Sequence, residues 1–80
     1  MGSGMDRIVE ILRTIRPGVN WEDLTGIIDD GLLDSFDMIS LIGELEDAFG
    51  VRIGLEYLEP ENFNTVSAMA KLLEKVGARL

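Results

Sequence analysis

The chain has 80 residues and a formal net charge of −8, and it contains neither cysteine nor histidine. This length predicts a single domain with a thin stability margin and no room for a deep, preorganised active site. The missing residue types exclude a disulfide framework, a cysteine-based metal site and the usual histidine base. We therefore expect a non-enzymatic module on which other proteins act.

The ends of the chain and its longest apolar runs indicate where the protein works. The first four residues precede a second methionine, Met5, and are interpreted as a cloning remnant, which leaves residues 5–80 as the domain. No apolar run approaches the roughly 18 residues of a membrane span, and no signal-peptide pattern is present. Together with the absence of cysteine, these features predict a cytoplasmic protein without a membrane span, which we expect to be a monomer.

The acidic residues are concentrated in the middle of the chain. Between Glu22 and Glu61 there are 12 acidic residues and one basic residue, Arg52, whereas the rest of the chain has 3 acidic and 6 basic residues. An acidic segment of this kind repels nucleic acid and attracts basic protein surfaces. The same charge also fits a solvated face that only keeps the protein soluble, and charge alone does not separate these interpretations.

The first half of the chain predicts a helix and then a long loop. Apolar residues at helical spacing predict a helix from Asp6 to Arg16, which Pro17 and Gly18 end. Residues 17–34 are rich in glycine and turn-forming residues and are predicted to form a loop. Frequent apolar residues predict that this loop packs against the core: Val19, Trp21, Leu24, Ile27, Ile28, Leu32 and Leu33. Packed loops of this length are usually functional.

A second helix is predicted from Ser35 to Phe49, with Gly50 just beyond its end. Its expected buried line is Met38, Leu41, Leu45 and Phe49. Three more apolar residues, Phe36, Ile39 and Ile42, exceed what one-sided burial requires. Either the helix is enclosed on two sides, or part of its apolar surface faces a partner.

The remainder of the chain predicts one short and one long helix. Residues 51–53 are expected to be an extended linker, and 55–63 a short helix or two helical turns, with Pro60 at a first helical position. The last helix is predicted to start after Thr65 as N-cap and to close at Gly77. Its buried face is expected to contain Val66, Met69, Ala70, Leu73 and Val76. The fold class is therefore all-α, with three long helices and one short one in a four-helix bundle.

Ser35, at the start of the second helix, is the candidate functional residue. Serine is a favoured N-cap residue, Asp34 could serve equally well, and Asp37 in the first turn suits the helix dipole. For a serine next to two aspartates at a helix start, a structural cap is therefore the ordinary interpretation.

Two longer segments favour a functional role for Ser35. Residues 31–53, GLLDSFDMISLIGELEDAFGVRI, combine an Asp-Ser pair, an apolar helix with acidic ends, a Phe-Gly pair and a short β-branched run. With residues 60–66, PENFNTV, this segment resembles the acyl carrier protein family, and the similarity spans roughly residues 5–78. The resemblance implies a four-helix carrier bundle in which Ser35, beside Asp34, receives 4′-phosphopantetheine from coenzyme A. Acyl or aminoacyl groups would then be carried as thioesters on its thiol.

The resemblance also implies partners. Ser35 has no sequence-evident base, so a separate phosphopantetheinyl transferase, assisted by Mg²⁺, is expected to modify it. Acyl- or aminoacyl-activating ligases and acyl-transfer enzymes are the expected exchange partners. Five residues of the second helix are expected to dock them, four by charge and one by an apolar contact: Asp37, Glu44, Glu46, Asp47 and Ile39.

The second helix departs from the family pattern at three positions. Phe36 stands where leucine or methionine is usual, Ser40 where glutamate is frequent, and Gly43 where a larger apolar residue is common. These differences suggest a dedicated activating ligase, as in D-alanyl carrier systems or secondary-metabolite pathways, instead of the general enzymes of fatty acid synthesis. The Leu33-Asp34 pair before the serine favours an acyl or D-alanyl carrier over a peptidyl carrier.

Three other interpretations were weighed. The chain could be an unmodified helical interaction domain, or a degenerate carrier with Ser35 as a structural N-cap. A calcium loop is rejected because, with Gly31 at the sixth position, Gly26 would occupy the first ligand position. A catalytic carboxylate pair lacks any cleft that so short a chain could be argued to form, and solvated acids are far commoner.

Overall fold

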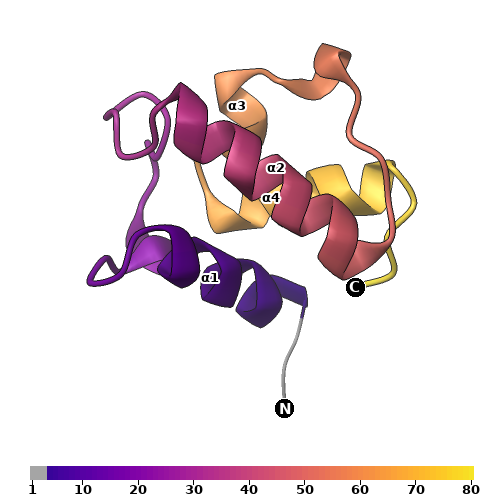
Figure 1. Ribbon diagram of the computed structural model, residues 1–80, viewed down its shortest axis with the longest axis horizontal. Coiled ribbons are helices and arrows are strands. Elements are labelled where there is room, and N and C mark those ends of the chain that lie inside the picture. Colours follow the sequence, from indigo (N-terminus) through magenta and orange to yellow (C-terminus); the bar gives the residue numbers. More distant parts are fainter. Residues whose placement is uncertain (1–3) are drawn as a thin grey trace.

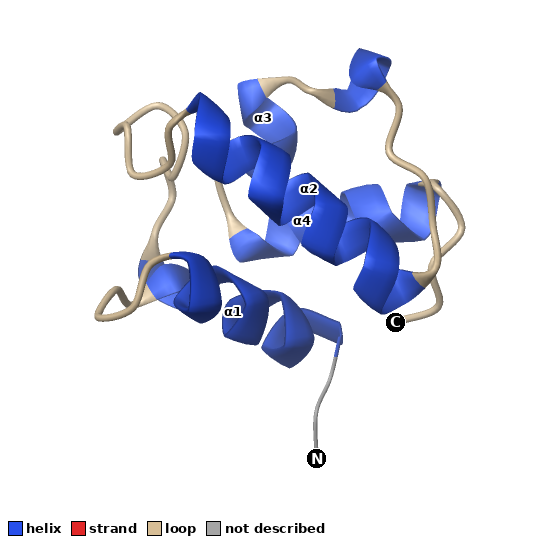
Figure 2. Ribbon diagram, viewed as in Figure 1, coloured by secondary structure: helices blue, strands red, loops and turns tan. Residues whose placement is uncertain are grey.

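The computed structural model describes residues 4–80 and contains helices, turns and loops (Figures 1 and 2). Its elements are the helices α1 (Gly4–Ile15), α2 (Ser35–Phe49), α3 (Pro60–Phe63) and α4 (Val66–Lys75), with 3₁₀ turns η1 (Trp21–Asp23) and η2 (Leu55–Tyr57). The predicted all-α bundle with three long helices and one short one is confirmed. Most of the predicted cloning remnant, residues 1–3, lies outside the described residues.

The element boundaries follow the local signals closely. Helix α1 starts at Gly4, two residues before the predicted start, and ends at Ile15, one residue before the predicted end. Differences of this size are usual at helix ends. Residues 51–53 form neither helix nor strand, in agreement with the predicted linker. Residues 55–63 form two separate turns, and Pro60 begins the second of them, α3.

The ends of the two later long helices are defined by capping residues. The hydroxyl of Thr65 accepts a hydrogen bond from the backbone N–H of Ala68 at 2.9 Å, which confirms Thr65 as the N-cap of α4. Gly50 ends α2 in the left-handed conformation, with φ +65°, which a residue without a Cβ adopts at little cost.

The core lies where α1, α2 and α4 meet. Helix α1 packs against both of the others, and α4 lies behind α2 in the view of Figure 1. Two fully buried residues from each helix form its centre: Ile8 and Leu12, Leu41 and Leu45, and Met69 and Leu73. Burying side chains of this size contributes about 1.5–3 kcal/mol each to folding.

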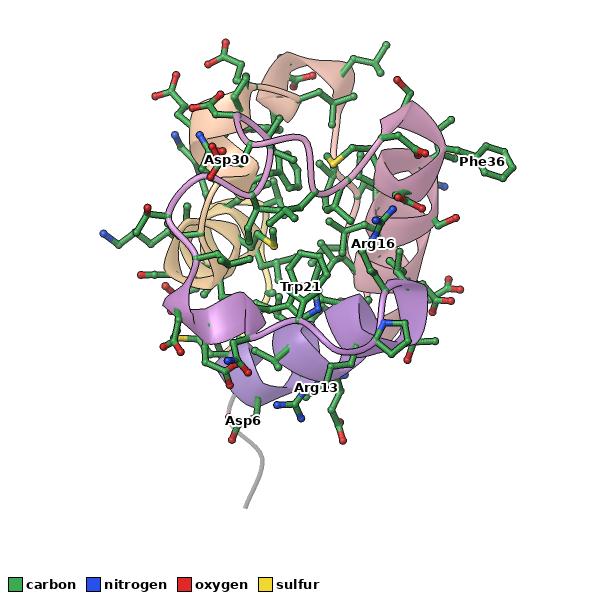
Figure 3. The ribbon with its side chains drawn as sticks, turned by 90° about the vertical axis from the view of Figure 1, so that its left-hand side faces the viewer. Asp6, Arg13, Arg16, Trp21, Asp30 and Phe36 are labelled. Carbon is green, nitrogen blue, oxygen red and sulfur yellow. The ribbon has the colours of Figure 1, made fainter. Side chains whose placement is uncertain are left out.

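The long loop between α1 and α2 is part of this core, as its apolar residues predicted. Trp21, Ile27 and Leu33 are buried, and the other four apolar residues are half-buried. Trp21 points into the interior (Figure 3), and its indole N–H donates a hydrogen bond to the Arg16 carbonyl at 3.2 Å. The loop is therefore held in a defined path that leads to the start of α2.

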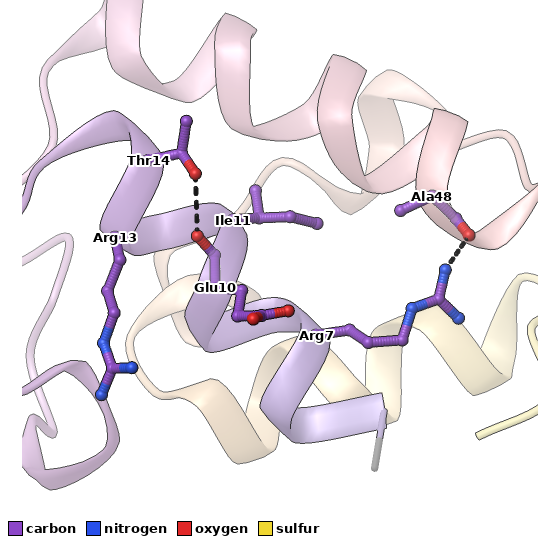
Figure 4. A pocket seen from close by; sticks show the side chains of 6 residues that line it. All are labelled: Arg7, Glu10, Ile11, Arg13, Thr14 and Ala48. Carbon is purple, nitrogen blue, oxygen red and sulfur yellow. Dashed lines mark hydrogen bonds between the residues drawn. The ribbon is translucent and has the colours of Figure 1, made fainter. Parts of the chain in front are cut away.

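A polar contact joins α1 to the far end of α2. The guanidinium of Arg7 lies 4.3 Å from the ring centroid of Phe49. It also donates to the Ala48 carbonyl (Figure 4). It thereby satisfies a carbonyl of the last turn of α2, which has no basic residue of its own. The depression beside this contact, about 550 Å³, is lined by arginine and glutamate side chains of opposite charge, so we assign it to helix packing.

Candidate functional site

The start of α2 is fixed by Asp34. Its backbone is extended, with φ −88° and ψ −178°, and its carboxylate accepts a hydrogen bond from the Asp37 N–H at 2.8 Å. The Asp37 carboxylate in turn accepts from the Asp34 N–H at 3.3 Å. This reciprocal pair is a capping box. The interpretation of Ser35 as the N-cap is therefore wrong, because Asp34 holds that position and Ser35 already has helical geometry.

Ser35 is consequently available for chemistry. It is the first residue of α2 and is exposed to solvent. Among residues 4–80 its hydroxyl forms no hydrogen bond, and the backbone N–H groups of Ser35 and Phe36 have no acceptor. These N–H groups and the dipole of the 15-residue helix favour an anionic group beside Ser35.

Part of the apolar surface of α2 is exposed to solvent, which fits the second of the two alternatives that its excess of apolar residues left open. Phe36 and Ile39 are 79% and 70% exposed, and the Phe36 side chain points away from the molecule (Figure 3). Leu41 and Leu45 are buried, whereas Met38 and Phe49 of the predicted buried line are only half-buried. Two large apolar side chains in water next to Ser35 mark a contact surface.

The acidic residues predicted for docking fall into two groups. Glu44 and Asp47 are exposed. Asp37, whose side chain is 21% exposed, forms an ion pair with Arg16 at 3.1 Å in addition to its capping bond. Glu46 accepts a hydrogen bond from the Ile53 N–H at 2.8 Å. The contacts of Asp37 and Glu46 thus give both residues a structural role.

An apolar groove of about 340 Å³ begins at Ser35. One wall is formed by α2 and the preceding loop, and the other by α3 and the two residues before it. Its lining residues are Ile28, Ser35, Met38, Ile39, Ile42, Leu58, Glu59, Pro60 and Phe63. The second wall was not predicted as part of the site. Its only sequence signal was the run of apolar residues between 55 and 63, which equally suits the core.

Glu59 is the ionisable residue of the groove lining. A hydrogen bond with Glu61, and then the repulsion between the two carboxylates, raises the pKa of Glu59 above its ordinary value. The groove therefore has an acidic rim and an apolar floor. Within residues 4–80, no three acidic side chains are grouped to hold a metal ion, and no helix is long and apolar enough to cross a membrane.

Comparison with known protein families gives one match. A family model described as a phosphopantetheine attachment site matches residues 18–73. The matched range contains the loop, the capping box, Ser35 and both walls of the groove, and covers most of the chain. No curated protein and no solved structure matches the chain.

Proposed function

The chain belongs to the phosphopantetheine attachment family, and we propose that Ser35 is the residue that bears the group. The family match makes the protein a carrier domain for covalently attached 4′-phosphopantetheine. The observation that supports Ser35 is its exposed hydroxyl, which lies at a helix start and is released from capping by Asp34. The site thus accommodates a phosphodiester without the loss of any bond that stabilises the fold.

The residues around Ser35 explain why attachment needs a second protein. The two carboxylates that flank Ser35 in the sequence, Asp34 and Asp37, are engaged in the capping box, and the chain has no histidine. No local group is therefore placed to remove the proton of the hydroxyl. A phosphopantetheinyl transferase would supply the base, and the N–H groups of the first turn would bind the resulting phosphate. The attached group supplies a terminal thiol, which carries its cargo as a thioester.

The groove supports an acyl cargo with an apolar portion. Ser35 is itself part of the lining, so a group attached there can fold back onto Met38, Ile42 and Phe63. The apolar lining favours aliphatic groups over charged ones. An aminoacyl cargo would place its ammonium group at the rim, where Glu59 offers a carboxylate. We propose the acyl group as the principal cargo, with the aminoacyl group as the alternative.

The exposed face of α2 is the proposed docking surface. Ile39, Glu44 and Asp47 are exposed on it, and Phe36 adds a large apolar contact next to Ser35. Acidic residues around apolar ones fit a partner surface with a basic rim and an apolar centre. Activating ligases and acyl-transfer enzymes with such a surface are the proposed partners. Asp37 and Glu46 would stabilise the helix that carries this surface, through their bonds to Arg16 and to the Ile53 N–H.

Attachment is tested by incubating the protein with coenzyme A and a promiscuous phosphopantetheinyl transferase and measuring its intact mass. We expect the gain of one phosphopantetheine group, and no gain for Ser35→Ala. Ser40→Ala is the matched control, because Ser40 is an exposed serine of the same helix, and it should be modified normally. Failure of the wild-type protein with several transferases, or modification of Ser35→Ala, would contradict the proposal.

A further inference from the structure

The second wall of the groove, within residues 58–63, belongs to a strap of residues 54–63 that comprises η2 and α3. Its hydrogen bonds close on the strap itself: the Tyr57 N–H donates to the Gly54 carbonyl at 3.1 Å, and the Asn62 side chain donates to the Tyr57 carbonyl at 2.8 Å. In the described part of the chain, no hydrogen bond or ion pair joins the strap to α2. Between its ends, the strap faces α2 across the groove through the apolar residues Leu58, Pro60 and Phe63 and through Glu59.

Polar contacts hold the strap at both ends. Immediately before it, the Ile53 N–H donates to the Glu46 carboxylate at 2.8 Å. Immediately after it, Asn64 bonds to the loop that precedes Ser35. The Asn64 carbonyl accepts from the Ile27 N–H at 3.0 Å, and its side-chain oxygen accepts from the N–H groups of Ile28 and Asp29 at 2.9 and 3.1 Å.

Both polar atoms of the Asn64 side-chain amide form hydrogen bonds. Its nitrogen also donates to the Asp29 carboxylate at 3.0 Å, so the side chain acts as acceptor and donor towards one loop segment. Neither alanine nor aspartate can replace this set of bonds. Asn64 follows Phe63 of the strap, and Ile28 belongs to the opposite wall. The Asn64 contact therefore fixes the separation of the two walls at one end of the groove.

From these contacts we infer that Asn64 and Glu46 are positioning residues that anchor the strap and thereby set how closely the groove covers the group attached to Ser35. This inference rests on the proposed attachment at Ser35 for its functional part. The geometry of the anchors is independent of it. Because apolar contacts between the anchors lack direction, the wall can yield to cargoes of different length while its ends stay in place.

The anchors are tested by amide hydrogen exchange of the strap, at a temperature well below the unfolding midpoint of every variant. Loss of one net hydrogen bond at the Asn64 anchor predicts about fivefold faster exchange in residues 55–63 for Asn64→Ala. Glu46→Ala should accelerate exchange at the other end. Matched controls are Asn20→Ala and Glu44→Ala, because both residues are exposed and Asn20 makes no side-chain cap bond.

The functional part is tested on the same variants carrying an octanoyl group. Octanoyl-coenzyme A and a promiscuous transferase would install octanoyl-phosphopantetheine, and the intact mass would report the attachment. Hydroxylamine should then cleave the thioester faster in Asn64→Ala than in wild type or Asn20→Ala. The double change Asn64→Asp with Asp29→Asn exchanges donor and acceptor between the two side chains, and it should restore protection that Asn64→Asp alone loses.

The possible outcomes separate the anchors from the attachment. Equal strap exchange in Asn64→Ala and Asn20→Ala would overturn the inference, as would faster exchange spread evenly over all helices, which indicates general destabilisation. Unchanged thioester cleavage with faster strap exchange would refute the covering of the cargo. Failure to gain mass would refute the attachment at Ser35, and the exchange experiment on the unmodified protein would still decide whether Asn64 anchors the strap.

Discussion

The division of roles between Asp34 and Ser35 predicts that two adjacent substitutions differ in their effect on stability. Asp34→Ala removes the acceptor of the 2.8 Å bond from the Asp37 N–H and breaks the capping box. Loss of an N-cap side chain costs about 1 kcal/mol of unfolding free energy. Ser35→Ala removes an exposed hydroxyl that caps nothing, and alanine is the better helix former. Its effect should therefore stay within about 0.5 kcal/mol of wild type.

Urea unfolding followed by far-ultraviolet circular dichroism distinguishes the two variants. For a chain of this size the denaturant slope is about 1 kcal/mol/M, so Asp34→Ala should lower the urea midpoint by about 1 M, whereas Ser35→Ala should leave it nearly unchanged. Asp34→Asn is the control, because asparagine caps as well as aspartate, and it should stay close to wild type. A loss of 1 kcal/mol or more in Ser35→Ala would show that its hydroxyl stabilises the helix start and would refute the assignment of the cap.

Three further substitutions test other parts of the structure. Gly43→Ala should raise the unfolding free energy by up to about 1 kcal/mol, because the added Cβ meets no atom within 4 Å; an unchanged or lower thermal midpoint would contradict this. Arg7→Met should cost about 1–2 kcal/mol by removing the bond to the end of α2 and the contact with Phe49, and a neutral result in urea would refute a structural role for that contact. Glu61 raises the pKa of Glu59, so the native state binds more protons than the unfolded chain. The stability contributed by protonated Glu59 therefore falls as pH rises past the ordinary pKa of 4.5. Glu59→Gln should flatten that fall in thermal midpoints measured from pH 4 upward.

The helices and the packed loop could be predicted because their signals are local. Apolar residues at helical spacing located α1, α2 and α4, and Thr65 and Pro60 are residues whose chemistry suits the positions they occupy. The cap of α2 could not be predicted, because Asp34 and Ser35 are equally good N-cap residues. The extended backbone of Asp34 and its bond from the Asp37 N–H show which of them precedes the helix.

The environment of the site depends on contacts between distant residues. Asn64 and Ile28 are separated by 36 positions, and nothing in the sequence around Asn64 distinguishes an anchor from an ordinary residue at a helix junction. Asp37 and Glu46 were likewise expected to face partners, because their charge would attract basic enzyme surfaces. Their internal bonds to Arg16 and to the Ile53 N–H became evident only when the elements were assembled.

The position of the cap explains how this carrier can be modified without a cost to its fold. If Ser35 were the N-cap, its oxygen would be held against the first turn, and a phosphodiester at that oxygen would weaken the capping bond. With Asp34 as the cap, the hydroxyl and the capping bond belong to different residues, and the buried residues Leu41 and Leu45 that hold α2 in the core lie further along the helix. A group attached at Ser35, as we propose, could therefore be added while α2 keeps every contact that stabilises it.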